Sequence, residues 1–295
     1  MTSKLPSLLN CQTLKNILSK PTSIKFSIIE ASFGKQSEDE FKNGHIPKAK
    51  YFDQLECTTP TKLIPRGLPE IKCFENLLTR LGVTNNHHVI IYDRSPFGFY
   101  ASSRAWFLLK AYGHNSLSVL DGGFYKWMND KNQIEAEKDN GQESQQEQAE
   151  KFRAKIDPGM WRKFDDIIEN LKKPLYREQL VDARPKNLFY GANGGHIPNS
   201  LNVPYTQMFD ATTGCLKPKE QLAEIYSKAG VNLSKPAVYT CQTGTTASTL
   251  AFVSHLLGQD PVSVYVGSFT EWSQKAPAEL IVKDEPQHDT KSNAA

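Results

Sequence analysis

Short apolar runs alternate with longer segments of helical pattern along most of the chain. The apolar runs are SIIEA, HVIIYD and LSVLDGG before residue 124, and LVDAR, LNVP, AVYT and VSVYVG after residue 179. The helical patterns are CFENLLTRLG, SSRAWFLLKAYG, PKEQLAEIYSKAG and STLAFVSHLLG, and each ends on the glycine that is common at helix C-termini. Near-continuous apolar strands that alternate with helices indicate parallel sheets covered on both faces. We therefore expect an α/β fold of two doubly wound parallel sheets with helices on both faces.

Several segments occur twice in the same order, which indicates two homologous halves. GHIPKAKYFD at 44–53 recurs as GHIPNSLNVPY at 195–205, and SVLDGGFYKW at 118–127 recurs as SVYVGSFTEW at 263–272. The segment between the halves is polar and poor in apolar residues, so it is typical of a linker. We expect a first domain at 22–130, a linker or inter-domain arm at 131–160 and a second domain at 172–284.

Composition and charge exclude several classes of function. Hydrophobic residues make up 39% and charged residues 23% of the 295 positions, as in a globular protein with a core. The formal net charge of +3 is small and dispersed, so no nucleic-acid partner is expected. No apolar run is long enough for a signal sequence or a membrane span, so no membrane partner is expected. The cytoplasm is the expected compartment. The mitochondrion is the alternative, because the N-terminus has Lys4, Lys15 and Lys20 and no acidic residue before Glu30, as in a mitochondrial presequence. The competing interpretation of the same segment is an amphipathic first helix with Leu8, Leu9 and Leu14 inward.

Five cysteines are scattered along the chain, at positions 11, 57, 73, 215 and 241, without a CxxC pair. An odd, scattered set disfavours both a disulfide framework and a metal site, and it fits a reducing compartment. We therefore expect no metal ligands and no disulfide.

The stretch YTCQTGTTAS at 239–248 places Cys241 directly after an apolar run and before a helical pattern. Ligands of open parallel sheets bind at the carboxyl ends of strands. A tight loop into a helix start turns backbone N–H groups inward, and it adds the positive end of the helix dipole. Such a loop stabilises a thiolate, so Cys241 is the predicted nucleophile, with a buried inert cysteine as the alternative. The residues expected to hold substrate or persulfide beside it are Gln242, Thr243, Gly244, Thr245 and Thr246.

Two chemistries use a cysteine held in such a loop. Cysteine-type phosphatases need an arginine at the end of the loop to bind the phosphoryl group, and this sequence has Ala247 there. The remaining option is a persulfide, whose outer sulfur needs N–H and hydroxyl donors rather than a guanidinium.

The motifs together resemble two-domain rhodanese-family sulfurtransferases, and are closer to the 3-mercaptopyruvate type than to the thiosulfate type. The matching segments are GHIP in both halves, YGH and LDGGFYKW in the first, FRAKIDP between them, and VDAR, NVPY, LSKPAVYTCQTGTTAS and VGSFTEW in the second. The resemblance implies tandem domains, a catalytic Cys241 and no cofactor. It implies that Cys241 takes a sulfane sulfur from 3-mercaptopyruvate or thiosulfate as a persulfide. A thiol, a thioredoxin-like protein or cyanide is then the implied acceptor.

The resemblance also implies a first domain without the nucleophile. A gapless alignment of the two loops through their glycines puts Ser95 where Cys241 stands. Two family positions have changed: Leu188 replaces an arginine that binds the substrate carboxylate, and Arg66 replaces a histidine. We therefore expect Arg66 to face the catalytic loop and to supply the missing positive charge.

Other changes and candidates complete the set. Leu55 and Val266 stand at positions where the family has aspartates. Arg184 follows Asp182 at a strand end, where it can contact a substrate anion or tie the strand to that acid. His45 and His196 lie in matching repeats, which favours a structural role. The alternative function is a divergent, weakly active rhodanese module that acts as a sulfur relay or binds a protein partner.

Overall fold

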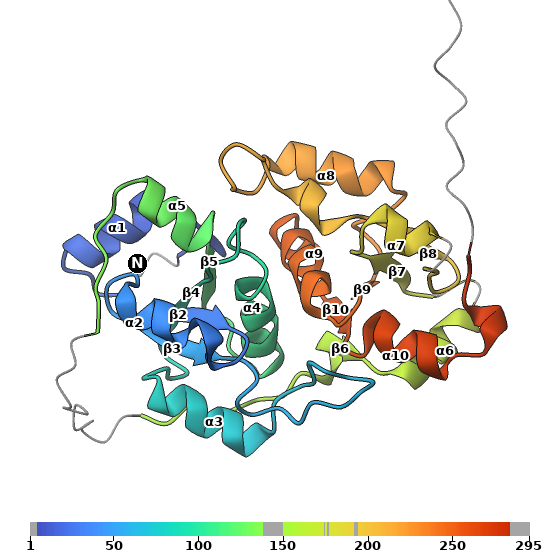
Figure 1. Cartoon of the computed structure of the whole chain (residues 1–295), viewed down its shortest axis with the longest axis horizontal. Helices are drawn as coiled ribbons and strands as arrows, with labels where there is room; N and C mark the ends of the chain where they lie inside the picture. Colours follow the sequence, from blue (N-terminus) through green and yellow to red (C-terminus); the bar gives the residue numbers. More distant parts are fainter. Residues whose placement is uncertain (1–4, 138–149, 174, 176, 192–193, 284–295) are drawn as a thin grey trace, which may run out of the picture.

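The chain forms two halves that each contain one five-stranded parallel sheet (Figure 1). A computed structural model describes residues 5–137, 150–173, 175, 177–191 and 194–283. The first sheet consists of β1 (Leu8–Leu9), β2 (Phe26–Ser32), β3 (Ala49–Asp53), β4 (His88–Tyr92) and β5 (Leu117–Leu120). The second consists of β6 (Trp161–Arg162), β7 (Gln179–Asp182), β8 (Ser200–Asn202), β9 (Ala237–Thr240) and β10 (Val262–Tyr265).

The two sheets have the same strand order, β1-β5-β4-β2-β3 in the first and β6-β10-β9-β7-β8 in the second. All the strand pairs of the described residues are parallel. Each sheet begins before the boundary expected from the sequence, at Leu8 rather than after 22 and at Trp161 rather than after 172. Both early strands have two residues and pair at a sheet edge, so their apolar pattern is too short to recognise. Residues 138–149 of the expected linker lie outside the described residues.

Ten helices within the described residues connect and cover the strands. In the first half they are α1 (Cys11–Ser19), α2 (Glu38–Asn43), α3 (Ile71–Arg80), α4 (Ser102–Ala111) and α5 (Gly123–Asn129). In the second half they are α6 (Phe164–Leu171), α7 (Lys186–Tyr190), α8 (Lys219–Lys228), α9 (Thr245–Leu256) and α10 (Ser268–Lys275). None of the helices in the described part of the chain is long and apolar enough to cross a membrane.

Alternate residues of each central strand pack on opposite faces of the sheet. Ile90 of β4 packs with residues of α1, α2 and α5, whereas Ile91 packs with residues of α3 and α4. In the second sheet, Val238 packs with α6 and α10, whereas Tyr239 packs with α8 and α9. This period of two on a sheet with two covered faces produces the continuous apolar runs of the sequence. The predicted fold class is therefore confirmed.

The two halves share one hydrophobic core, which is centred on α4 and α9. Figure 1 shows these two helices side by side between the sheets. Trp106 of α4 packs edge-on against Phe252 of α9, with ring centroids 5.1 Å apart. The hydroxyls of Ser103 and Thr249 are 2.9 Å apart and form a buried hydrogen bond between the helices. Because α4 and α9 are buried on nearly every side, each reads as an apolar helix rather than an amphipathic one.

The N-terminal segment departs from the expected single helix. Leu8 and Leu9 form β1 beside β5, and α1 starts only at Cys11. Asn10 is the reason, because its side chain accepts a hydrogen bond of 2.8 Å from the amide of Thr13 and caps the helix. Leu14 is buried as expected.

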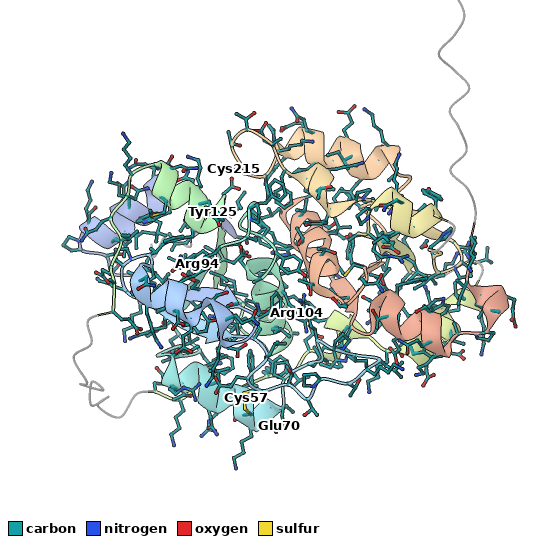
Figure 2. All side chains as sticks on the ribbon, in the orientation of Figure 1. Cys57, Glu70, Arg94, Arg104, Tyr125 and Cys215 are labelled. Atoms are coloured by element: carbon teal, nitrogen blue, oxygen red, sulfur yellow. A yellow bond between two sulfur atoms is a disulfide. The ribbon has the colours of Figure 1, made fainter. Side chains whose placement is uncertain are left out.

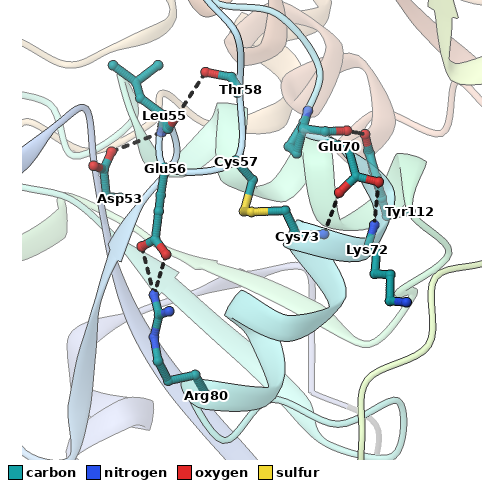
Figure 3. The surroundings of a disulfide bond; sticks show 11 residues. Asp53, Leu55, Glu56, Cys57, Thr58, Glu70, Lys72, Cys73, Arg80 and Tyr112 are labelled. Carbon is teal, nitrogen blue, oxygen red and sulfur yellow. Dashed lines mark hydrogen bonds and ion pairs between the residues drawn. A yellow bond between two sulfur atoms is a disulfide. The ribbon is translucent and has the colours of Figure 1, made fainter.

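The expectation of no disulfide is wrong, since Cys57 and Cys73 are joined (Figure 3). Their α-carbons are 5.5 Å apart although 16 positions separate them in sequence. The amide of Glu70 donates to the backbone oxygen of Cys57 at 2.8 Å. The Glu70 carboxylate then caps α3 by accepting from the amide of Cys73 at 2.7 Å. The spacing of the cysteines in the sequence does not show that Cys57 and Cys73 lie next to each other in the fold. The disulfide closes a loop that carries Arg66.

Candidate active site

The predicted catalytic loop lies between β9 and α9, at the carboxyl end of the second sheet. The four residues of β9 are fully buried, and the strand delivers Cys241 directly to the start of the loop. Gly244 has φ +82° and ψ 0°, a left-handed conformation that glycine adopts without steric cost. The glycine turns the chain sharply, so α9 begins at Thr245, slightly earlier than the sequence suggested.

The Cys241 sulfur lies inside this turn. The amide of Gly244 donates a hydrogen bond to the sulfur at 3.1 Å, and the amide of Cys241 donates to the Ser268 hydroxyl at 3.2 Å. The side chain is only 2% exposed, so the sulfur is withdrawn from bulk water. The N-terminal end of α9 adds a positive potential at this position. The arrangement suits a sulfur that carries negative charge.

The other loop residues differ in exposure. Gln242 is exposed, and its side-chain amide donates to the Thr270 hydroxyl at 3.0 Å. Thr243 and Thr246 are partly exposed, whereas Gly244 and Thr245 are buried. Among the described residues, the donor to the Cys241 sulfur is thus a backbone amide rather than a threonine hydroxyl.

Arg66 reaches the catalytic loop from the first domain. Its Nη1 donates to the Thr245 hydroxyl at 2.7 Å and to the Tyr100 hydroxyl at 2.9 Å. Its guanidinium also lies over the ring of Phe33, 4.1 Å from the centroid. The half-buried Arg66 therefore brings a positive charge to the loop that contains Cys241.

The remaining cysteines are in environments that disfavour a thiolate. Cys57 and Cys73 are joined as a disulfide. Burial, followed by the charge of Asp130, raises the pKa of Cys11 to about 12. Burial, followed by the charge of Asp121, raises the pKa of Cys215 to about 11. Both thiols are therefore protonated at neutral pH.

Arg184 is buried beside the second sheet. Its Nη2 donates to Asp182 at 2.7 Å and to the backbone oxygen of Gly195 at 2.8 Å. Its guanidinium also lies 3.8 Å from the ring centroid of Phe269, and the side chain is 3% exposed. These contacts occupy the guanidinium within the domain, which favours the structural interpretation over contact with a substrate.

The first domain repeats this arrangement with a different arginine. Arg94 pairs with Glu30, donates to the backbone oxygen of Gly44 and lies 4.0 Å from the ring centroid of Phe124. Gly44 and Phe124 occupy the same places in the first repeat as their counterparts in the second. A contact made in both halves, only one of which contains the catalytic loop, is a feature of the fold.

The repeated histidines have matching surroundings as well. The Nδ1 of His45 is 2.8 Å from the backbone oxygen of Phe41, and the two rings are stacked. The Nδ1 of His196 is 3.2 Å from the backbone oxygen of Phe189, again with stacked rings. Both histidines belong to the turn that follows a helix in each half.

The structural counterpart of Cys241 is Asp93, and the expectation of Ser95 is wrong. The backbone oxygen of Cys241 accepts from the amide of Phe269 at 3.0 Å, and that of Asp93 accepts from the amide of Phe124 at 3.0 Å. The two phenylalanines occupy the same position in the repeated segment. Asp93 therefore stands at the same point of its sheet as Cys241 does.

A longer first loop explains the misplaced alignment. Two more residues separate Asp93 from the glycine that follows than separate Cys241 from its glycine. The Asp93 carboxylate accepts from the amides of Ser95, Ala101 and Ser102 at 2.6–2.7 Å, and from the Ser95 hydroxyl at 2.5 Å. The amides that could bind an anion in the first loop are thus occupied by the chain's own carboxylate.

Arg104 is a residue near the site that the sequence analysis missed. It lies on α4 of the first domain, is 1% exposed, and has an electrostatic interaction with Cys241. A signal was present, because Arg104 is a charged residue at the start of an otherwise apolar stretch, AWFLL. A charge there must be paired or functional.

Three positions at which the sequence departs from the family pattern lie in different surroundings. Leu188 lies on α7 and is 43% exposed, so no positive charge replaces the expected arginine at that point. Val266 is buried, and its backbone oxygen lies 2.9 Å from where a β-carbon of Gly244 would be. Leu55 is half-buried after β3. The cations near the loop come from the first domain instead.

Two parallel sheets of one strand order, with a cysteine in the loop after the central strand of the second sheet, define the class of protein. The family model of the rhodanese-like domain matches residues 11–130 and 164–275. The chain therefore belongs to the rhodanese family, as the motifs indicated.

Named relatives resemble the chain over most of its length. The chain is 36% identical to 3-mercaptopyruvate sulfurtransferase of Mus musculus over 94% of this chain and 95% of that protein. It is 34% identical to thiosulfate sulfurtransferase of Gallus gallus over 85% and 86% of the two chains. Among solved structures, the 3-mercaptopyruvate sulfotransferase SseA from Escherichia coli matches with a TM-score of 0.74 and 27% identity. That match covers 90% of this chain and 99% of SseA.

Proposed function

The chain is a sulfurtransferase, and we propose that it moves a sulfane sulfur from a small donor, through a persulfide on Cys241, to a thiol or cyanide acceptor. The observation that carries this proposal is the position of the Cys241 sulfur. It is withdrawn from bulk water and accepts a hydrogen bond from the Gly244 amide at the N-terminus of α9. Similar chains are named 3-mercaptopyruvate and thiosulfate sulfurtransferases. The first loop, with Asp93 in place of the cysteine, supports a non-catalytic first domain.

The reaction has two displacement steps at sulfur. The Cys241 thiolate attacks the donor sulfur, an S–S bond forms, and the bond from that sulfur to the rest of the donor breaks. With 3-mercaptopyruvate the bonding pair leaves on carbon, which takes a proton to give pyruvate. With thiosulfate the pair leaves as sulfite. An acceptor thiolate or cyanide then attacks the outer sulfur and releases the Cys241 thiolate.

The donor preference follows from charge. The loop CQTGTT has no charged side chain, which resembles the mercaptopyruvate type. A mercaptopyruvate carboxylate still needs a cation, because an ion-paired hydrogen bond contributes about 1.5–3 kcal/mol. Arg66 supplies a cation at the loop, where its Nη1 donates to the Thr245 hydroxyl, whereas Leu188 is uncharged and exposed. We infer that Arg66 binds the donor carboxylate.

A second candidate is a weakly active module that relays sulfur to a protein or binds one. It is favoured by Leu188, which leaves an exposed apolar side chain where the family has a substrate-binding arginine. In that case Cys241 accepts sulfur slowly from small donors and discharges it to a thioredoxin-like partner.

One assay separates the two candidates. Sulfur release from 3-mercaptopyruvate and from thiosulfate is measured side by side with the wild type and with Cys241→Ser. We expect turnover that Cys241→Ser abolishes, with a higher kcat/KM for 3-mercaptopyruvate. Turnover of neither small donor, combined with a stable fold, would reject the enzyme and leave the relay module.

The cellular compartment is a separate inference. The cytoplasm, with the mitochondrion as alternative, was expected from the absence of a signal pattern and from free thiols. Disulfides persist mainly in oxidising surroundings, so the Cys57–Cys73 bond weakens the argument for a reducing compartment.

A further inference from the structure

Arg104 projects from α4 of the first domain to the place where the two halves meet (Figure 2). Its Nη2 donates to the backbone oxygens of Arg66 and Gly67, at 2.6 Å and 2.9 Å. These two bonds hold Arg104 against the loop that the Cys57–Cys73 disulfide closes. They use only one of the three nitrogens of the guanidinium.

The other two nitrogens are buried and have no hydrogen-bond partner within the described residues. A β-carbon built on Gly244 would lie 3.6 Å from Nη1, so this nitrogen faces the catalytic loop. The amide of the same glycine donates to the Cys241 sulfur. Arg104 and the sulfur therefore both lie close to Gly244, in the same turn.

The charge of Arg104 is costly where it lies. Burial, followed by repulsion from Arg66, lowers the pKa of Arg104 to about 10, whereas the negative charge of Cys241 acts in the opposite direction. With that pKa the guanidinium is still protonated at neutral pH. Two nitrogens without a hydrogen-bond partner on a fully buried cation are rare unless an anion comes close.

Among the described residues, the ionisable groups with the largest electrostatic effect on Arg104 are Arg66, Cys241, Tyr100 and Tyr112, none of which is a carboxylate. Burial raises the pKa of Tyr205, which also interacts with Cys241, so its hydroxyl is neutral at physiological pH. Arg66 and Tyr100 bond to each other. Glu271, on the helix after Ser268, is bonded to Tyr265 and Lys275.

We propose that Arg104 is a positioning residue of the first domain that stabilises the anionic sulfur of Cys241, both as thiolate and as persulfide. The loop of the second domain supplies the amide and the helix N-terminus, and the first domain supplies the full positive charge. The nucleophile is then complete only when α4 and α9 are packed together. The persulfide part of this inference rests on the proposed function, whereas the thiolate part does not.

The test measures the thiolate without any sulfur transfer. The ultraviolet absorbance of the Cys241 thiolate is followed against pH in the wild type, in Arg104→Gln and in Arg104→Lys. Each protein has its Cys241→Ser counterpart as the blank. We expect about tenfold less thiolate at a given pH in Arg104→Gln, because an opposite charge is lost. Arg104→Lys keeps the charge and should stay close to the wild type.

Two outcomes would overturn the proposal. One is an Arg104→Gln profile that coincides with the wild type. The other is an Arg104→Lys profile shifted as far as that of Arg104→Gln, which would mean that geometry rather than charge is responsible. If Arg104→Gln does not fold, the wild type is compared with its own unfolded chain. A native thiolate that forms at the same pH as in the unfolded chain, or at a higher one, overturns the proposal as well.

A kinetic readout separates this residue from Arg66. Arg104 acts on the sulfur of the enzyme, so Arg104→Gln should lower kcat/KM for 3-mercaptopyruvate and thiosulfate by the same factor. An effect confined to 3-mercaptopyruvate would assign Arg104 to the donor carboxylate instead. A protein without transfer activity but with the expected thiolate profile would reject the proposed function and keep the role of Arg104.

Discussion

Three of the five cysteines carry a free thiol, and burial raises the pKa of two of them, Cys11 and Cys215. The pKa of Cys215 is raised from 9.0 to about 11, so at a given pH below 9 it has about one hundredth of the thiolate of an ordinary cysteine. A raised pKa favours the protonated form, so reactivity appears only as the pH rises towards 11. We expect iodoacetamide at about pH 8 to modify Cys215 slowly, and the rate to increase about tenfold per pH unit. Peptide mapping against pH checks this, and a plateau below pH 9 would contradict the burial argument.

Arg66 is the residue that we propose binds the donor carboxylate. Its guanidinium contacts Thr245, within the loop of Cys241. Removal of the charge in Arg66→Ala should raise KM for 3-mercaptopyruvate about tenfold, because an ion-paired hydrogen bond to the carboxylate is lost. The effect on persulfide discharge to a thiol should be smaller.

The matched control for that variant is Lys62→Ala, which removes an exposed positive charge from the same loop. Steady-state kinetics with both donors separates the two. Equal effects of Arg66→Ala and Lys62→Ala would show that only the long-range charge of the loop matters.

At the scale of the elements, the Cys57–Cys73 disulfide attaches the loop before α3 to the helix itself. A cross-link over a segment of this length stabilises by about 3 kcal/mol, mainly because it restricts the unfolded chain. The double variant Cys57→Ser/Cys73→Ser should therefore lower the free energy of unfolding by about that amount. Urea unfolding measures it, with Cys215→Ser as the control that removes a thiol but no cross-link. A loss below about 1 kcal/mol would show that the loop is held by its other contacts.

The loop after β4 depends on one carboxylate. Asp93 accepts hydrogen bonds from three amides and one hydroxyl while it is 1% exposed. Asp93→Ala leaves buried donors unpaired, at about 1–3 kcal/mol each, so it should destabilise the first domain strongly. Ser95→Ala removes one hydroxyl from the same loop and should leave sulfur transfer within a few-fold of the wild type. Thermal unfolding and the transfer assay test the pair, and an inactive but stable Ser95→Ala would mean that the first loop takes part in the chemistry.

At the scale of the whole molecule, the repeat was readable from the sequence because both halves keep the same turn motifs. Strands β2, β4 and β5 of the first sheet and β7 to β10 of the second were predicted from their apolar runs, since both faces of each sheet are covered. Strands β1, β3 and β6 were not predicted. Cys241 was predicted because it follows β9 directly. No residue stands between this strand and Cys241, which leaves little freedom in where the thiol lies.

The missed features depend on contacts between segments far apart in the chain. Arg104 reaches Gly244 only because α4 packs on α9. Asp93 was missed because the first loop is two residues longer than the second. The Cys57–Cys73 disulfide was missed because it depends on a backbone hydrogen bond between Glu70 and Cys57. The argument against a phosphatase also considered the loop alone, which contains no arginine. In the structure, Arg66 and Arg104 approach that loop from the other domain.

The central claim is that Cys241 alone carries the transferred sulfur. Mass spectrometry of peptides after incubation with 3-mercaptopyruvate or thiosulfate, before any acceptor is added, tests it most directly. We predict one added sulfur on the peptide that contains Cys241, and none on that peptide in Cys241→Ser. The added sulfur on the peptide of Cys11 or Cys215 instead, with an unmodified Cys241, would contradict it.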